Sequence, residues 1–309
     1  MKTFSILVIG SIMMDLCLRT ERIPLAGESM ICDDYYRYIH GGKGANQAIA
    51  AARLCANTAF SGKVGSDPFG IDLAKALREA GICTDYLMTE KEGATGLAAI
   101  ILEKNGQNRI IVYPESNMKL TPAEVEKAFE KEYDAMMIQF EIPRETVIHA
   151  CRTAKEKGIP FIVDAGPAQN FPIEEITGAQ ILSPNETETY AMCRIRAEDS
   201  QSAEKASEIL MRRSKAKYIV IKAGGNGAYL YDGANIKHFP AYQGIAPVDT
   251  TAAGDAFTAA MTLEYLKTNN IEEAIRFAHA AGAISVTRMG AQPSLPALRE
   301  VEDFIAANR

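Results

Sequence analysis

The sequence lacks an excess of positive charge. Its 309 residues include 33 Lys or Arg and 39 Asp or Glu, which gives a formal net charge of −6. Such a chain has no general basic field that would hold nucleic acid or an anionic membrane surface, so neither is an expected partner. An anionic ligand must therefore be bound by a local site.

The sequence also lacks paired cysteines and long apolar runs. Its six cysteines are scattered without a C-x-x-C pair, which argues against a zinc site or a disulfide framework and favours a reducing cytoplasm. No apolar run approaches the ~18–20 residues of a membrane span. Residues 1–14 are followed at once by Asp15 without a small-residue cleavage site, so we interpret them as a buried first strand and not as a signal peptide.

What the sequence does have is an alternation of short apolar, β-branched segments with helical patterns. Strands are expected at 4–9, 58–62, 135–139, 161–164, 181–183 and 218–222, and helices at 46–54, 71–80 and 144–157. This alternation is typical of βαβ units and predicts an α/β fold, with a mostly parallel central sheet covered by helices on both faces. Ligands of such sheets bind at the carboxyl ends of the strands, here residues 10–11, 164–166, 184–185 and 223–225.

Residues 12–40 and 94–113 break this alternation with short alternating segments and turn residues, including a hairpin signal at 104–106. They predict a small antiparallel sheet inserted into one domain that spans residues 1–309, because no repeat or linker divides the chain. Long excursions in α/β enzymes are often lids, so we interpret this sheet as a lid over the active site. The alternative is a purely structural edge sheet.

Small residues precede a helical pattern near the C-terminus, in the segment DTTAAGDAF at 249–257. Backbone N–H groups at the start of a helix lack partners and the helix dipole adds positive charge, so Ala252, Ala253 and Gly254 predict an anion hole that suits a phosphoryl group. Asp255 is placed to accept a proton from an attacking hydroxyl. The alternative is that Asp255 only caps the helix.

A second glycine-rich segment, GGKGANQ at 41–47, opens another helical pattern. Its glycines let the backbone approach a small ligand, while Lys43 and Asn46 supply donors for hydroxyl groups. It is not a Walker A loop, since G-x-x-x-x-G-K-[ST] is absent from the sequence. A structural tight turn is the alternative.

These segments, together with NETE at 185–188, RFAHAA at 276–281 and GAQPS at 290–294, resemble ribokinases, within the broader family of fructokinase-like and adenosine-kinase-like carbohydrate kinases. The resemblance covers essentially the whole chain. It implies a three-layer α/β/α ribokinase-like fold with a lid, a homodimer formed through the lid, and ATP-dependent phosphorylation of the 5-hydroxyl of a pentose. The alternatives are a fructokinase-like or nucleoside kinase and, in a different class, a non-catalytic sugar-binding regulator.

The resemblance implies roles for the catalytic residues. Asp255 would deprotonate the sugar 5-hydroxyl, and the backbone of Ala252, Ala253 and Gly254 would hold the charge of the γ-phosphoryl group. Asn185 and Glu188 match an N-x-x-E motif that helps place Mg²⁺ and the phosphates, since hard oxygen ligands suit that ion. Both residues could also cap the helix that follows.

The nucleotide and cation positions come from the same resemblance. ATP would be bound by Asn185, Lys222, Gly224, Gly225, Gly227, Gly254 and His279. Lys222 stands where a threonine is typical of ribokinases, and His279 could equally be a satisfied core histidine. A monovalent cation, K⁺, would be bound mostly by backbone carbonyls of Asp249, Thr251, Ser285, Arg288, Gly290 and Ser294.

The implied sugar-binding residues are Met13, Asp15, Gly42, Lys43, Asn46, Glu141 and Asp255. Met13 departs from the ribokinase pattern, in which an asparagine helps bind the 2-hydroxyl region, and resembles deoxyribokinases. A hydroxyl facing the weak thioether acceptor loses a hydrogen bond worth about 0.5–1.5 kcal/mol net. We therefore expect 2-deoxy-D-ribose to be accepted or preferred, with D-ribose still accepted. The alternative is that the Met13 side chain turns away from the sugar.

Overall fold

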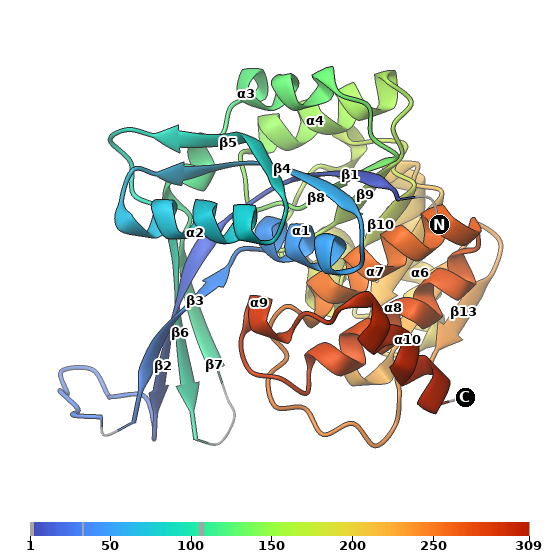
Figure 1. The fold of residues 1–309 in the computed structure, drawn as a ribbon. Helices are drawn as coiled ribbons and strands as arrows, with labels where there is room; N and C mark the ends of the chain where they lie inside the picture. The colour runs from blue at the N-terminus through green and yellow to red at the C-terminus, as the bar shows by residue number, and fades with distance from the viewer. Residues whose placement is uncertain (1–2, 33, 105–107, 309) are drawn as a thin grey trace.

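The computed structural model describes residues 3–32, 34–104 and 108–308. Within these ranges the chain forms a nine-stranded sheet in the order β13-β12-β11-β10-β9-β8-β1-β4-β5 and a four-stranded sheet in the order β3-β2-β6-β7 (Figure 1). The large sheet is the centre of the body, and the small sheet projects from one side of it.

Seven strands of the large sheet run parallel, and the last two add an antiparallel edge. Each strand expected from the sequence is present, which confirms the mostly parallel sheet. The strands are β1 (Ser5–Ile9), β4 (Asn57–Gly65), β5 (Cys83–Glu90), β8 (Ala135–Ile138), β9 (Phe161–Asp164), β10 (Ile181–Ser183), β11 (Tyr218–Lys222), β12 (Ala228–Tyr231) and β13 (Ile236–Phe239).

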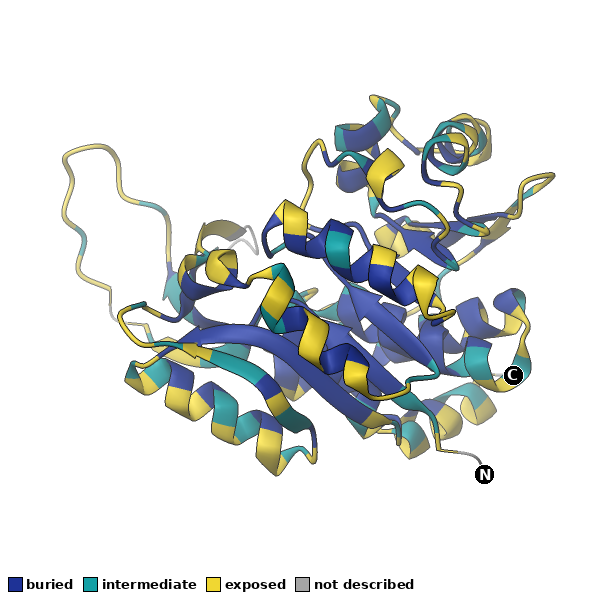
Figure 2. Ribbon diagram, turned by 90° about the horizontal axis from the view of Figure 1, so that it is seen from above, coloured by how far each residue is buried: buried dark blue, intermediate teal, exposed yellow. Residues whose placement is uncertain are grey.

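Helices cover both faces of this sheet, as Figure 2 shows for the buried strands between partly exposed helices. Alternate side chains of β1 point to opposite faces, so Ile6 and Val8 join one hydrophobic cluster while Leu7 and Ile9 join the other. The helices are α1 (Lys43–Arg53), α2 (Pro68–Glu79), α3 (Pro122–Glu126), α4 (Arg144–Glu156), α5 (Glu186–Cys193), α6 (Ser200–Ser214), α7 (Ala253–Thr268), α8 (Ile271–Ser285), α9 (Ala291–Ser294) and α10 (Leu298–Ala307).

The small sheet contains β2 (Met13–Thr20), β3 (Tyr36–Gly41), β6 (Gly96–Glu103) and β7 (Asn108–Tyr113). The expectation of an antiparallel sheet is wrong for its central pair, because β2 and β6 run parallel. The chain between these two strands passes through the body, and such a crossover brings strands together in parallel where a hairpin would not. The expected hairpin turn at 104–106 lies largely outside the described residues.

Candidate active site

The predicted catalytic residue, Asp255, is the third residue of α7 and is almost fully buried. Its carboxylate accepts hydrogen bonds from Nδ2 of Asn46 at 2.9 Å and from Nε2 of Gln47 at 3.2 Å, both on α1. Burial raises the pKa of Asp255 to about 6, although Lys43 and the two amides act against burial. The side chain does not cap its own helix, because no side chain hydrogen bond caps the start of α7.

The predicted anion hole is the start of this same helix. Ala252 is in the left-handed conformation, with φ of 62°, which turns the chain sharply into the 16 residues of α7. Ala253 N–H donates to the carbonyl of Thr250, but within the described residues no acceptor faces the N–H groups of Gly254 and Asp255. Two unpaired donors and the positive end of a helix dipole favour an anion here.

The glycine segment at 41–47 brings α1 against the end of β1. Gly42, with φ of 89°, precedes α1, and a Cβ at this position would lie 2.8 Å from the backbone of Ile12 and Met13. Gly44 packs as closely on Gly10, where a Cβ would lie 2.7 Å from the backbone. Both glycines are therefore required by close backbone packing, which fixes the start of α1, where Asn46 lies beside Asp255. This packing does not exclude a contact with a ligand.

Two of the predicted sugar-binding side chains, Asp15 and Asn46, are buried polar groups. Oδ1 of Asn46 is fully buried and has no hydrogen-bond partner among the described residues. Burial, followed by the charges of Glu141 and Asp255, raises the pKa of Asp15 to about 7. Both side chains can accept hydrogen bonds from hydroxyl groups, so this donor and acceptor set fits a sugar.

Met13 lies two residues before Asp15 on β2, so the two side chains share one face of the small sheet. Met13 is buried against Gly96 of β6, where a Cβ would lie 3.0 Å from its Cγ and 2.4 Å from Nδ2 of Asn117. The neighbouring Asn117 has no free donor to replace the missing asparagine, because Nδ2 donates to the backbone of Ile12 and Pro114, while Oδ1 accepts from the N–H of Ile12. This register puts Met13 on the same face of β2 as Asp15, and whether its side chain contacts the sugar stays a prediction.

Glu141 and Lys43 complete the predicted sugar-binding set. Glu141 accepts hydrogen bonds from the Ser11 hydroxyl and from the backbone N–H of Lys43, which ties the ends of β1 and β8 to the start of α1. The Lys43 side chain reaches Gly166, where a Cβ would lie 2.7 Å from Nζ. Burial disfavours this ammonium, but the surrounding carboxylates outweigh burial and raise its pKa.

Asp164 is fully buried at the end of β9, a strand end that the sequence marked for ligand binding but to which it assigned no role. Its Oδ1 accepts a hydrogen bond from Nζ of Lys222 at 2.6 Å, and its Oδ2 accepts one from Nε2 of Gln47 at 2.8 Å. Gln47 in turn accepts a hydrogen bond from Gln139 at 2.6 Å. Gln139 was missed altogether, although it too directly follows a buried strand.

Asn185 and Glu188 form the capping box of α5, which shows that they do cap the helix. The Asn185 side chain accepts from the N–H of Glu188, and Glu188 Oε2 accepts from the N–H of Asn185. The second oxygen, Oε1, faces Gly166 without a hydrogen-bond partner in the described part of the chain, and burial raises the pKa of Glu188. A buried carboxylate with one free oxygen fits a cation.

The glycines expected to contact the nucleotide differ in whether there is room for a side chain at their position. Gly224 and Gly225 have open space where a Cβ would be, whereas a Cβ on Gly227 would lie 2.0 Å from the carbonyl of Phe239. Gly227 is therefore required by the close approach of the β13 end. His279 lies beside Phe257, with ring centroids 5.3 Å apart, and burial lowers its pKa to about 4. Its Nε2 is buried without a partner among the described residues, and a place near the nucleotide base stays a prediction.

The six residues expected at the monovalent cation lie in two segments, 249–251 and 285–294. A hydrogen bond from Gly290 to Asp249 joins these segments into one loop cluster. The Asp249 carboxylate accepts from the N–H and hydroxyl of Thr251 and from the N–H of Gly290 at 2.8 Å. Ser285 and Ser294 hydrogen-bond through their hydroxyls at 2.8 Å. The Arg288 guanidinium pairs with Glu300, which leaves only its backbone for an ion.

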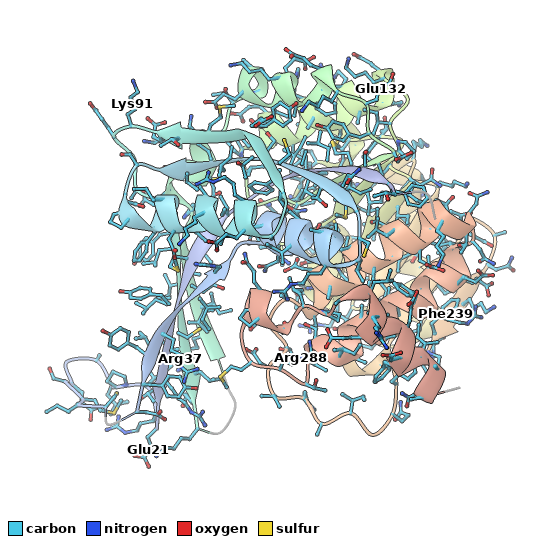
Figure 3. All side chains as sticks on the ribbon, in the orientation of Figure 1. Glu21, Arg37, Lys91, Glu132, Phe239 and Arg288 are labelled. Atoms are coloured by element: carbon cyan, nitrogen blue, oxygen red, sulfur yellow. The ribbon has the colours of Figure 1, made fainter. Side chains whose placement is uncertain are left out.

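A cavity separates the small sheet from this loop cluster. Asp15, Cys17 and Arg37 line it from the sheet, while Asp249 and Gly290 line it from the body. Figure 3 labels Arg37 on the small sheet and Arg288 on the facing part of the body.

Among the described residues no group of three or more His, Cys, Asp or Glu side chains has the geometry of a metal site. No helix in the described ranges is long and apolar enough to cross a membrane.

Comparison with known proteins identifies the family of this chain. Residues 3–298 match the family described as "pfkB family carbohydrate kinase". The chain is 36% identical over 307 residues to a ribokinase of Bacillus subtilis, covering 98% of this chain and 99% of that one. It is 30% identical over 306 residues to a deoxyribokinase of Salmonella typhi, covering 98% of this chain and 99% of that one. It is 35% identical over 306 residues to a bifunctional ribokinase/ribose-5-phosphate isomerase A of Fructilactobacillus sanfranciscensis. The match covers 97% of this chain and 56% of that longer protein.

Among solved structures, ribokinase of Arabidopsis thaliana, complexed with ribose and ATP, superposes with a TM-score of 0.89 at 31% identity, covering 98% of this chain and 99% of that one. The chain therefore belongs to the pfkB family of carbohydrate kinases and has the ribokinase-like fold. It is a sugar kinase of the ribokinase type, a phosphotransferase.

Proposed function

We propose that this kinase transfers the γ-phosphoryl group of ATP to the 5-hydroxyl of a pentose, and that both D-ribose and 2-deoxy-D-ribose are substrates. The observation that carries the proposal is the position of Asp255. Its carboxylate lies at the unpaired N–H groups of α7 and is held by Asn46 of the glycine segment. A hydroxyl placed beside Asn46 thus meets both a base and an anion hole.

The reaction follows from these groups. The carboxylate of Asp255 accepts the proton of the 5-hydroxyl while that oxygen forms a bond to the γ-phosphorus, and the bond from the γ-phosphorus to the bridging oxygen of ADP breaks. The N–H groups of Gly254 and Asp255 stabilise the charge on the transferred group. Asp15, Lys43, Asn46 and Glu141 hold the sugar by its other hydroxyls.

Two ions are part of the proposal. Mg²⁺ would supply charge neutralisation of the phosphates, and the free oxygen of Glu188 would hold it through water or directly, together with Asn185. K⁺ would be bound by carbonyls of the loop cluster around Asp249, whose side chain is already used in fixing the loops. This cluster contains Thr251, directly before the residues of the anion hole, so its role is to shape that turn.

The nucleotide would lie along the carboxyl ends of β10 and β11. Asn185 and Lys222 lie at the phosphate end, Gly224 and Gly225 offer open backbone, and Gly227 shapes the turn. The unpartnered Nε2 of His279 is consistent with a place near the base. A similar solved structure, ribokinase of Arabidopsis thaliana, is complexed with ribose and ATP, which supports ATP as the nucleotide.

Met13 supports 2-deoxy-D-ribose as a substrate. It places an apolar side chain on the face of β2 that carries Asp15, and no nearby amide replaces the asparagine of ribokinases. The likeness to a deoxyribokinase points the same way. We expect Met13→Asn to move the ratio of kcat/KM values towards ribose by about two- to tenfold, the equivalent of one hydrogen bond. An unchanged ratio would show that Met13 does not contact this part of the sugar.

The small sheet is proposed to act as the lid and as a dimer interface. The face of the sheet that points away from Asp15 carries the row Tyr38, Leu16, Ala99 and Ile111. Tyr38 is 52% exposed and Ile111 is 53% exposed. A second copy of the chain would cover these apolar side chains and the strand edges.

A substrate panel tests the proposed function against its alternatives. ADP release is measured with ribose, 2-deoxyribose, fructose and a set of nucleosides. Turnover of the two pentoses well above that of the others supports the proposal. A preference for fructose or a nucleoside would assign another kinase of the family, and binding of a sugar without turnover would assign a regulator.

A further inference from the structure

An ion pair crosses the end of the large sheet, and its aspartate, Asp164, has no role in the reaction proposed above. Asp164 lies on β9 and Lys222 on β11, with β10 between them, and Nζ of Lys222 lies 2.6 Å from Oδ1 of Asp164. Asp164 is fully buried and the side chain of Lys222 is 12% exposed. Burial of a charged pair is costly unless its geometry and hydrogen bonds are good, so its presence calls for a reason.

The lysine lies at the anion hole. A Cβ built on Gly254 would lie 3.9 Å from Nζ of Lys222, so the ammonium is beside the first turn of α7. The backbone of Lys222 is fixed by its N–H bond to Pro184 and by a bridge to Asn185. The side chain thus ends between the Asp164 carboxylate and Gly254 in the first turn of α7.

The aspartate is connected to the base. Gln47 donates from Nε2 to Oδ2 of Asp164 at 2.8 Å and to Oδ1 of Asp255 at 3.2 Å. The orientation of this amide is set by Gln139, which donates to its oxygen. Gln47 therefore holds two carboxylates at once, one facing Lys222 and the other facing the sugar.

We propose that Asp164 and Lys222 are a coupled pair in which Asp164 positions the Lys222 ammonium to contact the transferred phosphoryl group, and in which Gln47 links that pair to Asp255. This proposal rests on the proposed function and adds a cation where ribokinases typically have a threonine. Lys222 contacts the reacting group, whereas Asp164 and Gln47 are positioning residues. An ammonium at the anion hole offsets the negative charge that the transferred group carries.

The ion pair also affects the pKa of Asp255, the proposed base. Lys43 from α1 lowers the pKa of Asp255 and Asp164 from β9 raises it. Lys222 and Lys43 hold the pKa of Asp164 low and keep it charged against the effect of burial. The other charged groups around the site are Asp15 on β2, Glu141 after β8, Glu188 on α5 and Asp249 before α7.

The two charges of the pair therefore have opposite effects on Asp255. Lys222→Thr leaves the negative charge of Asp164 without its nearest cation, which raises the pKa of Asp255. Asp164→Asn removes that negative charge, which lowers the pKa of Asp255. The double variant removes both charges and returns the pKa towards that of the wild type.

The experiment is a double-mutant cycle on the full chain. It compares the wild type with Lys222→Thr, Asp164→Asn and the double variant, and adds Lys222→Arg. Lys217→Thr is the matched control, because Lys217 lies just before the other end of β11 and contacts Tyr265. We expect Lys222→Thr to lower kcat/KM for ATP by about 10–100-fold while KM for the sugar changes less than about twofold. Lys222→Arg should recover part of this loss, and Lys217→Thr should behave as wild type.

The pH profiles test the coupling. The acid limb of kcat should move to higher pH in Lys222→Thr, to lower pH in Asp164→Asn, and back towards the wild type in the double variant. A pair with a purely structural role would shift both single variants in the same direction or neither, and that result would overturn the proposal. The double variant, which buries no unpaired charge, separates misfolding from a lost contact.

Binding separates this proposal from the proposed function. Calorimetry compares ATP with AMP for the wild type and Lys222→Thr in the absence of sugar. A loss of about tenfold or more for ATP, with AMP unchanged, supports the Lys222 contact even if no pentose is turned over. Equal losses for ATP and AMP, or none, would overturn it whatever sugar the enzyme uses.

Discussion

Asn46 donates a 2.9 Å hydrogen bond to Asp255, and this contact joins the glycine segment of α1 to the first turn of α7 across 209 residues of sequence. Because Oδ1 of Asn46 has no partner among the described residues, the amide can flip and accept a hydrogen bond when residue 255 is an asparagine. Asp255→Asn should therefore fold and bind sugar, but lower kcat by about 10²–10⁴-fold. Steady-state kinetics and sugar calorimetry check this, and a kcat within threefold of wild type would remove Asp255 as the base.

The rate should depend on two carboxylates that titrate near neutral pH. The pKa of Asp255 is raised to about 6 and that of Asp15 to about 7, chiefly by burial. Both must be ionised, one as the base and the other as an acceptor for sugar hydroxyls. The value of kcat/KM for the sugar should fall below about pH 7 and fall more steeply below about pH 6, in two coupled steps. A flat profile from pH 5 to pH 8 would contradict these roles.

Asp15 should destabilise the ligand-free protein at neutral pH. Its folded pKa is raised from 3.8 to about 7, so the folded state binds the proton more tightly than the unfolded state does. The free energy of unfolding contributed by this group therefore falls as pH rises from about 4 to 7. Asp15→Asn should increase the free energy of unfolding by up to about 4 kcal/mol at pH 7.5, and by little near pH 4. Urea unfolding at the two pH values measures this, and Asp34→Asn, at an exposed aspartate in the bend before β3, is the control. An equal effect at both pH values would refute the assignment.

The apolar outer face of the small sheet should hold two copies of the chain together. Ile111→Glu places a charge in the row formed with Tyr38, Leu16 and Ala99 and should convert a dimer into monomers. Tyr190→Glu changes an exposed aromatic residue on α5 and should leave the mass unchanged. Light scattering distinguishes the two outcomes. A wild type that is monomeric at all concentrations would contradict the dimer.

Sequence patterns were sufficient for six of the nine strands of the large sheet, because buried parallel strands are short apolar runs bounded by turn residues, as at Phe161–Asp164. The strands towards the two edges of the sheet, β5 on one side and β12 and β13 on the other, were not predicted. The parallel pairing of β2 with β6 was missed, since it depends on a crossover through the body and not on local pattern. The site was predictable wherever one segment carries the chemistry, as in Asp255 and Asn46. The links from Gln139 through Gln47 to Asp164 and Lys222 were not, because these residues come from separate strand ends and a helix, and their contacts exist only once the sheet is assembled.

The product formed from ATP and a pentose tests the central claim most directly. The enzyme is incubated with ATP, Mg²⁺ and K⁺ together with D-ribose, 2-deoxy-D-ribose or 5-deoxy-D-ribose, and phosphorus–proton correlation NMR identifies the oxygen that carries the new phosphate. The account predicts a phosphate on O5 of the first two sugars and no product from 5-deoxy-D-ribose, which lacks the hydroxyl that Asp255 deprotonates. A phosphate on any other oxygen, or equal turnover of 5-deoxy-D-ribose, would contradict it.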